Sequence, residues 1–518
     1  MQIVRQWMRF ETCLESSEEY PSNAHQLRVR VAFSHEERET QGVDAFWDGF
    51  RTWRVRFMPD RPGKWNWLVQ SSDKGLNGKS GEFRCEPYMG DNLLYRHGAV
   101  RVASSGRNFE FACGTPFFWL GDTVWNGPLK ATLEDWTCFL SDREDKGFNL
   151  IQFVPTQWVA GAGNADLRTA YVAAGELRID PFFFQWLDRR IDLINEFGMI
   201  ACPALIWAAP SKEWALPLNP GTSLSDDHII ALAAYMVARY GAHHVIWMLA
   251  GDGDYRGEKA ARWKRIGQAV FGGSRHLATM HPMGQIWAGH EFGAESWFRF
   301  HGYQSSHWDH DDAWRWITNG PPSTEWARDP PRPVVNMEPC YEAHLDMTNP
   351  LKAGRRAFDG NDVRRACYWS LLVSPPAGVT YGASGVWSWE LSPQPPMNHF
   401  LTGVAPPWRE AMELPGSRSM KVLRQVFESV AWWTLVPSPE LILEQPCEAK
   451  AFIAGAKSAS GDLAVIYTPG PAVIKLRTDR LKSPFAAEWV DPVSGRRQDA
   501  IEPFETPGAA DWVLILRG

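Results

Sequence analysis

The feature that most constrains the fold is a regular alternation of strand-like and helix-like segments between residues 90 and 430. Eight apolar runs rich in β-branched and aromatic residues recur there, and most end in polar or small residues. They cover residues 117–125, 148–158, 198–207, 244–252, 276–284, 298–306, 333–342 and 378–387. Helical periodicity lies between many of them, at 133–147, 180–198, 226–241, 258–271 and 361–373. Eight strands with intervening helices predict a (β/α)₈ barrel.

A doubly wound parallel sheet is the main alternative to a barrel. Such a sheet would rarely need eight strands, and the chain contains neither GxGxxG nor GxxxxGK[ST]. Helix signals fit the barrel units, since Asp180 followed by Pro181 marks a start and Gly147, Gly198 and Gly241 mark ends. We therefore predict a barrel that spans residues 89–432.

Short alternating runs flank this region on both sides and predict two β-sandwiches, at 1–88 and 433–518. The helical segment 419–433 separates the second sandwich from the barrel. We expect both sandwiches to act as packing supports more than as carbohydrate-binding modules. The strand-like runs are LRVRVAF (27–33), WRVRFMP (53–59) and WNWLVQS (65–71), then LAVIYTP (463–469), AVIKLRT (472–478), AAEWVDP (486–492) and WVLILRG (512–518).

Bulk composition limits the class of protein. The 518 residues carry a net charge of −7, with 44% hydrophobic and 22% charged residues and no basic runs, so we expect neither a nucleic-acid nor a membrane partner. The eight cysteines form no CxxC pair, which favours a reducing compartment. The first residues, MQIVRQWMRFE, lack the apolar stretch of a signal peptide, which predicts a cytoplasmic protein. The oligomeric state stays open.

Two of the predicted strands end in carboxylates. HHVIWMLAGDGDY (243–255) delivers Asp252, and RPVVNMEPCYE (332–342) delivers Glu338. The carboxyl ends of barrel strands meet at one mouth, so these two acids are the candidate catalytic pair. Asp254 and Glu342 are the nearest substitutes. The structural alternatives are that Asp252 caps a helix and that Glu338 pairs with an arginine at the rim.

Polar and aromatic side chains also follow the other strands. Such convergence on one mouth is typical of an active site, whereas an inert barrel would show it at one or two strand ends. The candidate substrate-binding residues are Asp122, Trp125, Gln157, Trp158, Trp207, His281, Gln304, His307, Tyr341, Glu342, Tyr381 and Trp387.

Paired carboxylates in a chain with 28 tryptophans indicate glycoside cleavage. One carboxylic acid protonates the leaving oxygen, one carboxylate stabilises or attacks the anomeric carbon, and no cofactor is required. We expect Asp252 to be the acid. Tryptophan supplies flat apolar faces for sugar rings, and Trp158, Trp207 and Trp387 are the candidate walls. Sugar hydroxyls would be held by Asp122, Gln157, Gln304 and His307.

The cluster HWDHDD (307–312) could ligate a metal, but no HExxH or cysteine partner supports this. We favour a sugar contact for His307, with the following acids solvated or capping a helix. His243 and His244 precede a strand and are therefore expected at the opposite end of the barrel in a structural role. Because no GxSxG is present, a serine hydrolase is disfavoured.

The motifs together resemble the apiosidase-like glycoside hydrolases over nearly the whole chain. FFWLGDTVW, VIWMLAGD, QSSH and NMEPCYE resemble that family's barrel motifs, WDGFRTWRVRFMPDRPGKWNW (47–67) its N-terminal module, and MKVLRQVFESVAWWTLVP (420–437) its junction with a C-terminal domain. The resemblance implies that Asp252, after the fourth strand, is the acid/base and that Glu338, after the seventh, is the nucleophile. It also implies retaining hydrolysis of a terminal furanoside, apiose-like or arabinofuranose-like, or of a related sugar, and we expect the enzyme to be exo-acting.

The chain departs from the family around Asp252. It has AGD (250–252) where GGD is common, and GDY (253–255) follows where the family has a basic loop. Two other functions stay open on the residues alone. An inverting glycosidase could use the same two carboxylates. A carbohydrate-binding protein without activity could keep the barrel, although intact acids at both strand ends argue against it.

Overall fold

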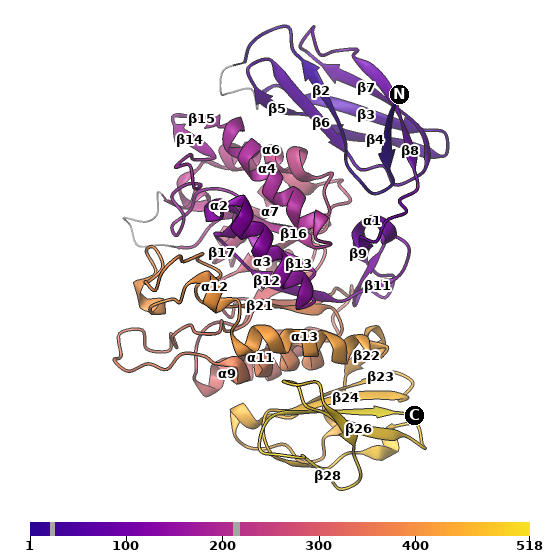
Figure 1. The fold of residues 1–518 in the computed structure, drawn as a ribbon, viewed down its shortest axis with the longest axis vertical. Helices are drawn as coiled ribbons and strands as arrows, with labels where there is room; N and C mark the ends of the chain where they lie inside the picture. The colour runs from indigo at the N-terminus through magenta and orange to yellow at the C-terminus, as the bar shows by residue number, and fades with distance from the viewer. Residues whose placement is uncertain (21–25, 211–217) are drawn as a thin grey trace.

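The protein folds into three regions stacked along its long axis, with the barrel in the middle (Figure 1). The structure is a computed structural model, and it describes residues 1–20, 26–210 and 218–518. The N-terminal sandwich lies at one end, and the C-terminal sheet lies at the other. The predicted fold class is confirmed.

The N-terminal region consists of two sheets, ordered β1-β8-β7-β3-β4 and β2-β6-β5. Alternate residues of these strands face inward, and Phe10, Phe33, Phe57 and Phe83 stack between the sheets. The strands are β1 (Gln2–Arg5), β2 (Phe10–Glu15), β3 (Val29–His35), β4 (Arg38–Asp44), β5 (Phe46–Gly49), β6 (Thr52–Phe57), β7 (Gly63–Ser71) and β8 (Ser80–Glu86).

Eight parallel strands form the barrel; seven fall within the predicted runs, and the fourth, β17, extends one residue beyond its run. In chain order they are β12 (Trp119–Thr123), β13 (Leu150–Phe153), β16 (Ile200–Trp207), β17 (Trp247–Gly253), β18 (Ala278–Pro282), β19 (His301–Gln304), β20 (Val334–Glu338) and β21 (Gly378–Gly382). Each strand pairs with its neighbour in sequence, and β12 pairs with β21. Between β18 and β19 the circle closes through the Arg299 N–H, which donates to the Ala278 carbonyl at 2.9 Å.

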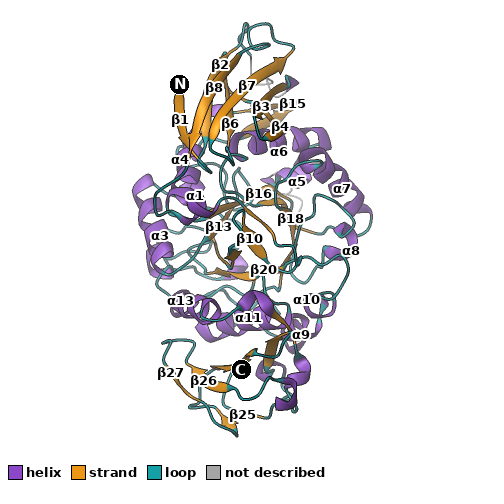
Figure 2. Cartoon of the chain, turned by 90° about the vertical axis from the view of Figure 1, so that its right-hand side faces the viewer, coloured by secondary structure: helices purple, strands orange, loops and turns teal. Residues whose placement is uncertain are grey.

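Helices surround the strands in a ring (Figure 2). Predicted ends are confirmed at Asp180, whose side chain caps a helix, and at Gly147 and Gly198, which take positive φ angles of 81° and 72°. The long helices are α3 (Leu133–Asp145), α4 (Pro181–Glu196), α6 (Asp226–Tyr240), α7 (Glu258–Phe271), α9 (Asp311–Asn319), α11 (Gly360–Val373) and α13 (Pro415–Glu428). The short ones are α1 (Leu93–His97), α2 (Gly127–Lys130), α5 (Pro220–Ser223), α8 (Gly289–Phe292), α10 (Pro321–Thr324) and α12 (Trp408–Ala411).

Two small sheets lie outside the eight barrel strands. The sheet of β9 (Val100–Val102), β10 (Phe109–Phe111) and β11 (Pro116–Phe117) closes the bottom, where the Phe109 ring centroid lies 5.8 Å from that of Trp119 and 5.3 Å from that of Phe300. The hairpin of β14 (Tyr171–Ala174) and β15 (Glu176–Ile179) belongs to the loop after the second barrel strand. The bottom is therefore sealed by aromatic packing, which leaves the opposite end for the loops.

The C-terminal region is a six-stranded sheet, ordered β22-β23-β24-β29-β26-β27, with a two-stranded sheet of β25 and β28. One face packs on the barrel helices: the Tyr467 and Tyr368 rings stack at 4.6 Å, and Arg364 forms a buried ion pair with Asp511. The other face covers a core of its own. The strands are β22 (Leu435–Pro437), β23 (Ala454–Ser458), β24 (Leu463–Thr468), β25 (Val473–Ile474), β26 (Ala486–Val490), β27 (Arg497–Asp499), β28 (Phe504–Glu505) and β29 (Trp512–Arg517).

Buried charge joins the N-terminal sandwich to the barrel. Arg239 of α6 is fully buried and contacts Asp48 at 2.9 Å and Asp188 at 2.7 Å, and Arg56 of β6 contacts the same Asp188 at 2.6 Å. Burial opposes ionisation of Asp188, but the two guanidinium groups outweigh it and lower the pKa of this carboxyl well below its usual range. The sandwich is thus fixed to helices α4 and α6.

Candidate active site

The two candidate catalytic acids end the fourth and seventh barrel strands, as predicted from the sequence. Asp252 takes a positive φ of 52°, and the pairing of β17 with β18 shifts register on either side of Gly251. A left-handed conformation in a residue other than glycine stores strain of about 1–3 kcal/mol, and such residues cluster at functional sites. The backbone is therefore distorted at the acid that the sequence singled out.

A register shift also sets the direction of Glu338. Tyr303 pairs with Asn336, but the next residue of β19, Gln304, pairs with Glu338, so Met337 is an extra residue in β20. Asn336 points outward, where its amide donates to Ser370 of α11 at 3.0 Å. In a regular strand Glu338 would point the same way, and the bulge turns it inward.

Two histidines hold Glu338. His281 Nε2 lies 3.0 Å from Oε2, and His307 Nε2 lies 2.9 Å from Oε1. His307 Nδ1 accepts a hydrogen bond from the Tyr341 N–H at 3.2 Å, so its proton is on Nε2 and it donates to the carboxylate. Burial alone would raise the pKa of Glu338, but the hydrogen bonds from His281 and His307 reverse this and lower it well below the usual range. Glu338 is therefore held as an anion.

Asp252 has the opposite electrostatic environment. Burial is the largest cause and the negative charge of Glu338 the second, and together they raise the pKa of Asp252 from 3.8 to about 6. Gln304 Nε2 lies 3.4 Å from its Oδ1. The mouth thus contains one ionised carboxylate beside one carboxyl that keeps its proton in weak acid, which is the arrangement that assigns acid and base roles to a pair.

Tryptophans build a wall next to the acids. The Trp125 ring centroid lies 5.3 Å from that of His281 and 5.1 Å from that of Trp207, and Trp207 lies 4.6 Å from Trp158. Trp387 continues the wall, 6.4 Å from Trp158. Within the described part of the chain, the indole N–H groups of Trp207 and Trp387 are buried without a hydrogen-bond partner. Both indole groups are therefore enclosed by the protein without a polar partner.

Eight of the twelve predicted substrate-binding residues are connected by contacts around the two acids. Trp125 also donates to the Tyr341 hydroxyl at 3.1 Å, which joins the wall to the loop after β20. The connected residues are Trp125, Trp158, Trp207, His281, Gln304, His307, Tyr341 and Trp387.

The other four predicted residues do not face the site. Asp122 and Tyr381 belong to β12 and β21, which pair in regular register, and both point outward. Asp122 forms a fully buried ion pair with Arg143 of α3 at 2.7 Å. The Tyr381 hydroxyl donates to Glu342 at 2.7 Å, and Glu342 in turn accepts from the Gly416 N–H at the start of α13. Strand alternation places these side chains against the helices, so the structure does not bring them together with the two acids.

Gln157 is not brought to the two acids either. Its amide is used by the backbone of the hairpin, since Nε2 donates to the Tyr171 carbonyl at 2.8 Å and Oε1 accepts from the Ala170 N–H at 2.9 Å. The substitute acids do not fit either. Asp254 contacts Arg256 and Lys259 at the surface, which lowers its pKa to about 2, and Glu342 caps a helix.

The residues after His307 have structural roles. The His310 side chain caps the start of α9, and Asp309 contacts Arg356 and Lys450. Asp311 and Asp312 lie in the first turn of the same helix. Across residues 1–20, 26–210 and 218–518, no group of three or more histidine, cysteine, aspartate or glutamate side chains could hold a metal ion.

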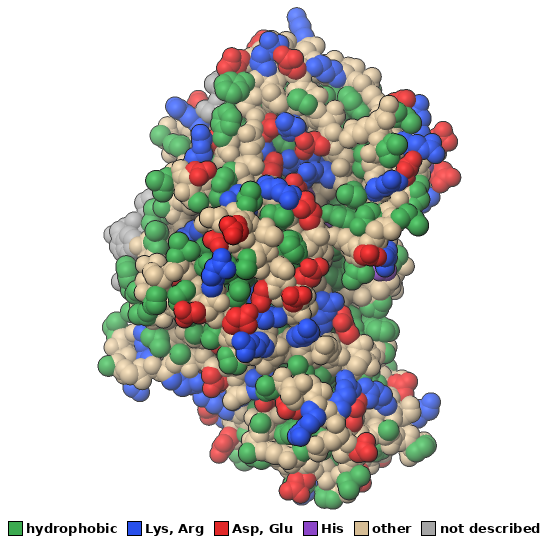
Figure 3. Space-filling view, in the orientation of Figure 1, with side chains coloured by type: hydrophobic (Ala, Val, Ile, Leu, Met, Phe, Trp, Pro, Cys, Tyr) green, Lys and Arg blue, Asp and Glu red, His purple; other side chains and the backbone are tan. Residues whose placement is uncertain are grey.

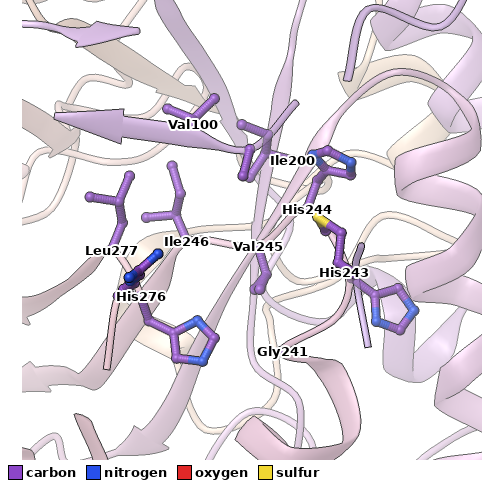
Figure 4. Close-up of a pocket in the computed structure, with 12 residues that line it drawn as sticks. Val100, Ile200, Gly241, His243, His244, Val245, Ile246, His276 and Leu277 are labelled. Carbon is purple, nitrogen blue, oxygen red and sulfur yellow. The ribbon is translucent and has the colours of Figure 1, made fainter. Parts of the chain in front are cut away.

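His243 and His244 lie at the opposite end of the barrel, as expected. His244 Nε2 donates to the Trp7 carbonyl at 2.9 Å, and His243 Nε2 lies 2.8 Å from Asp192. Both histidines line a cavity of about 100 Å³ together with Val100, Ile200 and His276 (Figure 4). They connect the barrel to the N-terminal region and are far from the two acids along the strands.

Two histidines near the site were missed by the sequence reasoning. The His344 ring stacks on that of His307 at 4.3 Å, and the His399 ring lies 5.4 Å from that of Trp387. Both are in loops, after the seventh and eighth strands, where no periodic pattern marks a residue. Burial lowers the pKa of both. Their position in mouth loops was the one signal available.

Comparison with known proteins gives one clear family match. A family model described as "Apiosidase-like, catalytic domain" matches residues 103–434, more than half of the chain, and a model of a domain of unknown function, DUF5060, matches residues 3–72. Comparison with curated protein sequences finds no match. Within the described residues, no helix has the length and apolar character needed to cross a membrane.

Solved structures share the fold. A putative glycoside hydrolase from Bacteroides vulgatus is 20% identical, with a TM-score of 0.70 and coverage of 100% of both chains. A glycoside hydrolase family 5 structure from the same organism is 20% identical, with a TM-score of 0.70, over 82% of this chain and 94% of its own. Another structure, described as "Glycoside hydrolase", is 22% identical, with a TM-score of 0.71, over 82% of this chain and 98% of its own.

Proposed function

The chain belongs to the apiosidase-like glycoside hydrolases, and we propose that it is an exo-acting, retaining member in which Asp252 is the acid/base and Glu338 is the nucleophile. We propose as its substrate a glycoside with a terminal furanose, apiose-like or arabinofuranose-like. The family supplies the reaction class, while the residues of the mouth supply the assignment of roles.

The observation that carries the assignment is the contrast between the two carboxyl groups. The pKa of Glu338 is held low by two histidine donors, whereas burial and the charge of Glu338 raise that of Asp252 to about 6. A nucleophile must be ionised and a general acid must be protonated at the same pH. Between the two pKa values both conditions hold.

The reaction then has two steps. Asp252 gives its proton to the glycosidic oxygen while a Glu338 oxygen attacks the anomeric carbon, so the C–O bond to the leaving group breaks and a glycosyl ester forms. The ionised Asp252 next removes a proton from water, which attacks the same carbon and releases Glu338. His281 and His307 orient the carboxylate throughout, because each binds one of its oxygens.

The tryptophan wall supports sugar binding. Trp158 and Trp207 place flat apolar rings beside the two acids, and such rings stack on the C–H faces of sugars. Gln304 contacts Asp252 and can hold a hydroxyl near the anomeric carbon. We also propose that the enzyme works in a reducing, cytoplasmic compartment, since all eight cysteines are free thiols.

A screen of 4-nitrophenyl furanosides and pyranosides, including the α-L-arabinofuranoside, tests this proposal. For a cleaved substrate, Glu338→Gln should reduce kcat by at least about 10³-fold, because the nucleophile is lost. Asp252→Asn should give a similar loss on alkyl glycosides, whereas the matched control Asp254→Asn should keep wild-type turnover because that acid is at the surface.

The stereochemistry of the first product separates the two mechanisms. Proton NMR during the first minutes of turnover should show the anomer of the substrate if the enzyme is retaining. The opposite anomer would refute a covalent intermediate on Glu338 and assign an inverting mechanism to the same acids. Wild-type kinetics from Glu338→Gln would overturn the assignment of the site.

A further inference from the structure

Exposed apolar side chains gather in one loop at the barrel mouth. Of 23 large hydrophobic residues that are exposed among the described residues, five lie within residues 391–404, after the eighth barrel strand. They are Leu391, Met397, Phe400, Leu401 and Val404, with exposed fractions between 42% and 73%. This stretch lies beside α12 at the left edge of Figure 1, and Figure 3 shows hydrophobic side chains along the same edge.

The loop is fixed in place. Gln394 and Ala405 pair through two backbone hydrogen bonds, 3.2 and 2.9 Å long, so residues 395–404 form a closed loop, here called the rim loop. Asn398 Nδ2 donates to the Val159 carbonyl at 2.7 Å, which ties the rim loop to the loop after the second strand. Exposed apolar side chains are common on mobile segments. The rim loop, in contrast, is fixed both at its base and by its contact with the loop after the second strand.

The loop after the seventh strand holds the rim loop as well. The Leu345 N–H donates to the Thr402 carbonyl at 3.1 Å, and Arg355 Nη2 donates to the Leu401 carbonyl at 2.8 Å. These polar groups of the rim loop are therefore used for its own attachment. What the loop presents outward is mainly hydrocarbon.

The rim loop adjoins the tryptophan wall beside the two acids. His399, the residue before Phe400, lies with its ring 6.0 Å from that of Trp158 and 5.4 Å from that of Trp387. One side of the loop therefore completes the sugar-binding wall, while the next side chains along the chain face outward. Phe400 and Leu401 therefore follow directly on the residue that contacts the wall, and both are exposed.

We propose that the rim loop binds the leaving group of the substrate, and that this leaving group is an apolar aryl or alkyl aglycone. The inference rests on the function proposed above. A sugar chain in this place would need partners for its hydroxyls, whereas an aglycone needs apolar area. The enzyme would thus cleave small glycosides of apolar alcohols, with the sugar in the pocket and the aglycone on the rim loop.

Binding of 2-naphthol, a free aglycone, tests the proposal without reference to the sugar. Calorimetry should show a weakening of about tenfold in the double variant Phe400→Ser/Leu401→Ser, the effect of removing roughly 60 Å² of apolar contact. The matched control is Leu443→Ser/Ile501→Ser, two exposed apolar residues of the C-terminal region. It should bind 2-naphthol as the wild type does.

Kinetics separate this proposal from the function itself. For a sugar that the wild type cleaves, the rim-loop variant should raise KM for the 2-naphthyl glycoside about tenfold and leave that for the methyl glycoside unchanged. Equal 2-naphthol binding by variant and wild type overturns the aglycone site even if glycosides are cleaved. If the rim-loop variant binds 2-naphthol as the wild type does but sediments as a different oligomer, the rim loop is a contact between copies of the chain and the aglycone site is likewise overturned. If the wild type binds 2-naphthol on the rim loop but cleaves no glycoside, the proposed function fails instead.

Discussion

The pKa of Asp252 predicts how activity should depend on pH. With this pKa at about 6 and that of Glu338 far lower, kcat/KM should be constant in weak acid and fall above pH 6 as Asp252 loses its proton. The protonated fraction falls tenfold per pH unit, so at pH 8 kcat/KM should be about one hundredth of its plateau. The loss is due to the acid and not to the nucleophile, which stays ionised throughout.

The leaving group distinguishes the acid from other titrating residues. A methyl glycoside needs a proton on its leaving oxygen, so its kcat/KM should show the full decline above pH 6. A 2,4-dinitrophenyl glycoside of the same sugar leaves without a proton, so its kcat/KM should stay nearly flat between pH 6 and pH 8. Equal declines for both substrates, or a midpoint near 4, would refute the role of Asp252 as a buried general acid.

Three further outcomes follow from the buried charges. Because burial raises the pKa of Asp252 from 3.8 to about 6, the folded state loses stability as pH rises through this range. Urea unfolding at pH 8 should therefore give Asp252→Asn a free energy of unfolding about 3 kcal/mol above that of the wild type. An unchanged free energy of unfolding would contradict a desolvated carboxylate. Arg239→Met removes a fully buried guanidinium that contacts both Asp48 and Asp188, and should lower the free energy of unfolding by at least about 3 kcal/mol, whereas exposed Arg189→Met should lower it by under about 0.5 kcal/mol. Asp122→Asn breaks the buried pair with Arg143 and should lower Tm while KM stays unchanged; a raised KM with unchanged Tm would restore Asp122 to the sugar site.

The fold was predictable because its signals are repeated and local. Each apolar run and each helix cap depends on only a few neighbouring residues. A mistake in the bounds of one element therefore leaves the number of predicted strands unchanged. The strand count then placed Asp252 and Glu338 fourth and seventh, since sequential parallel strands in a barrel lie side by side. The closing helix was harder to delimit: expected at 419–433, it begins at Pro415 and ends at Glu428.

The site was predictable only in part, because position at a strand end does not give direction. Asp122 and Gln157 are polar residues near strand ends, but neither points to the acids. Asp122 pairs with Arg143 of a helix, and Gln157 bonds to the backbone at residues 170 and 171. No sequence pattern marks either partner. His399 contributes to the wall from a loop that no periodicity describes. Long-range pairing decided each of these cases, and a single sequence does not show it.

Glu338 shows the physical reason most clearly. Alternation along β20 would place it on the side of Asn336, against α11, as it places Tyr381 outward on β21. One extra residue, Met337, reverses the direction and brings the carboxylate between His281 and His307. Regular pairing of β12 with β21 has no such reversal, so Asp122 and Tyr381 stay outward. The difference between a catalytic acid and a structural one in this barrel is therefore set by the register between neighbouring strands and not by the residue type at the strand end.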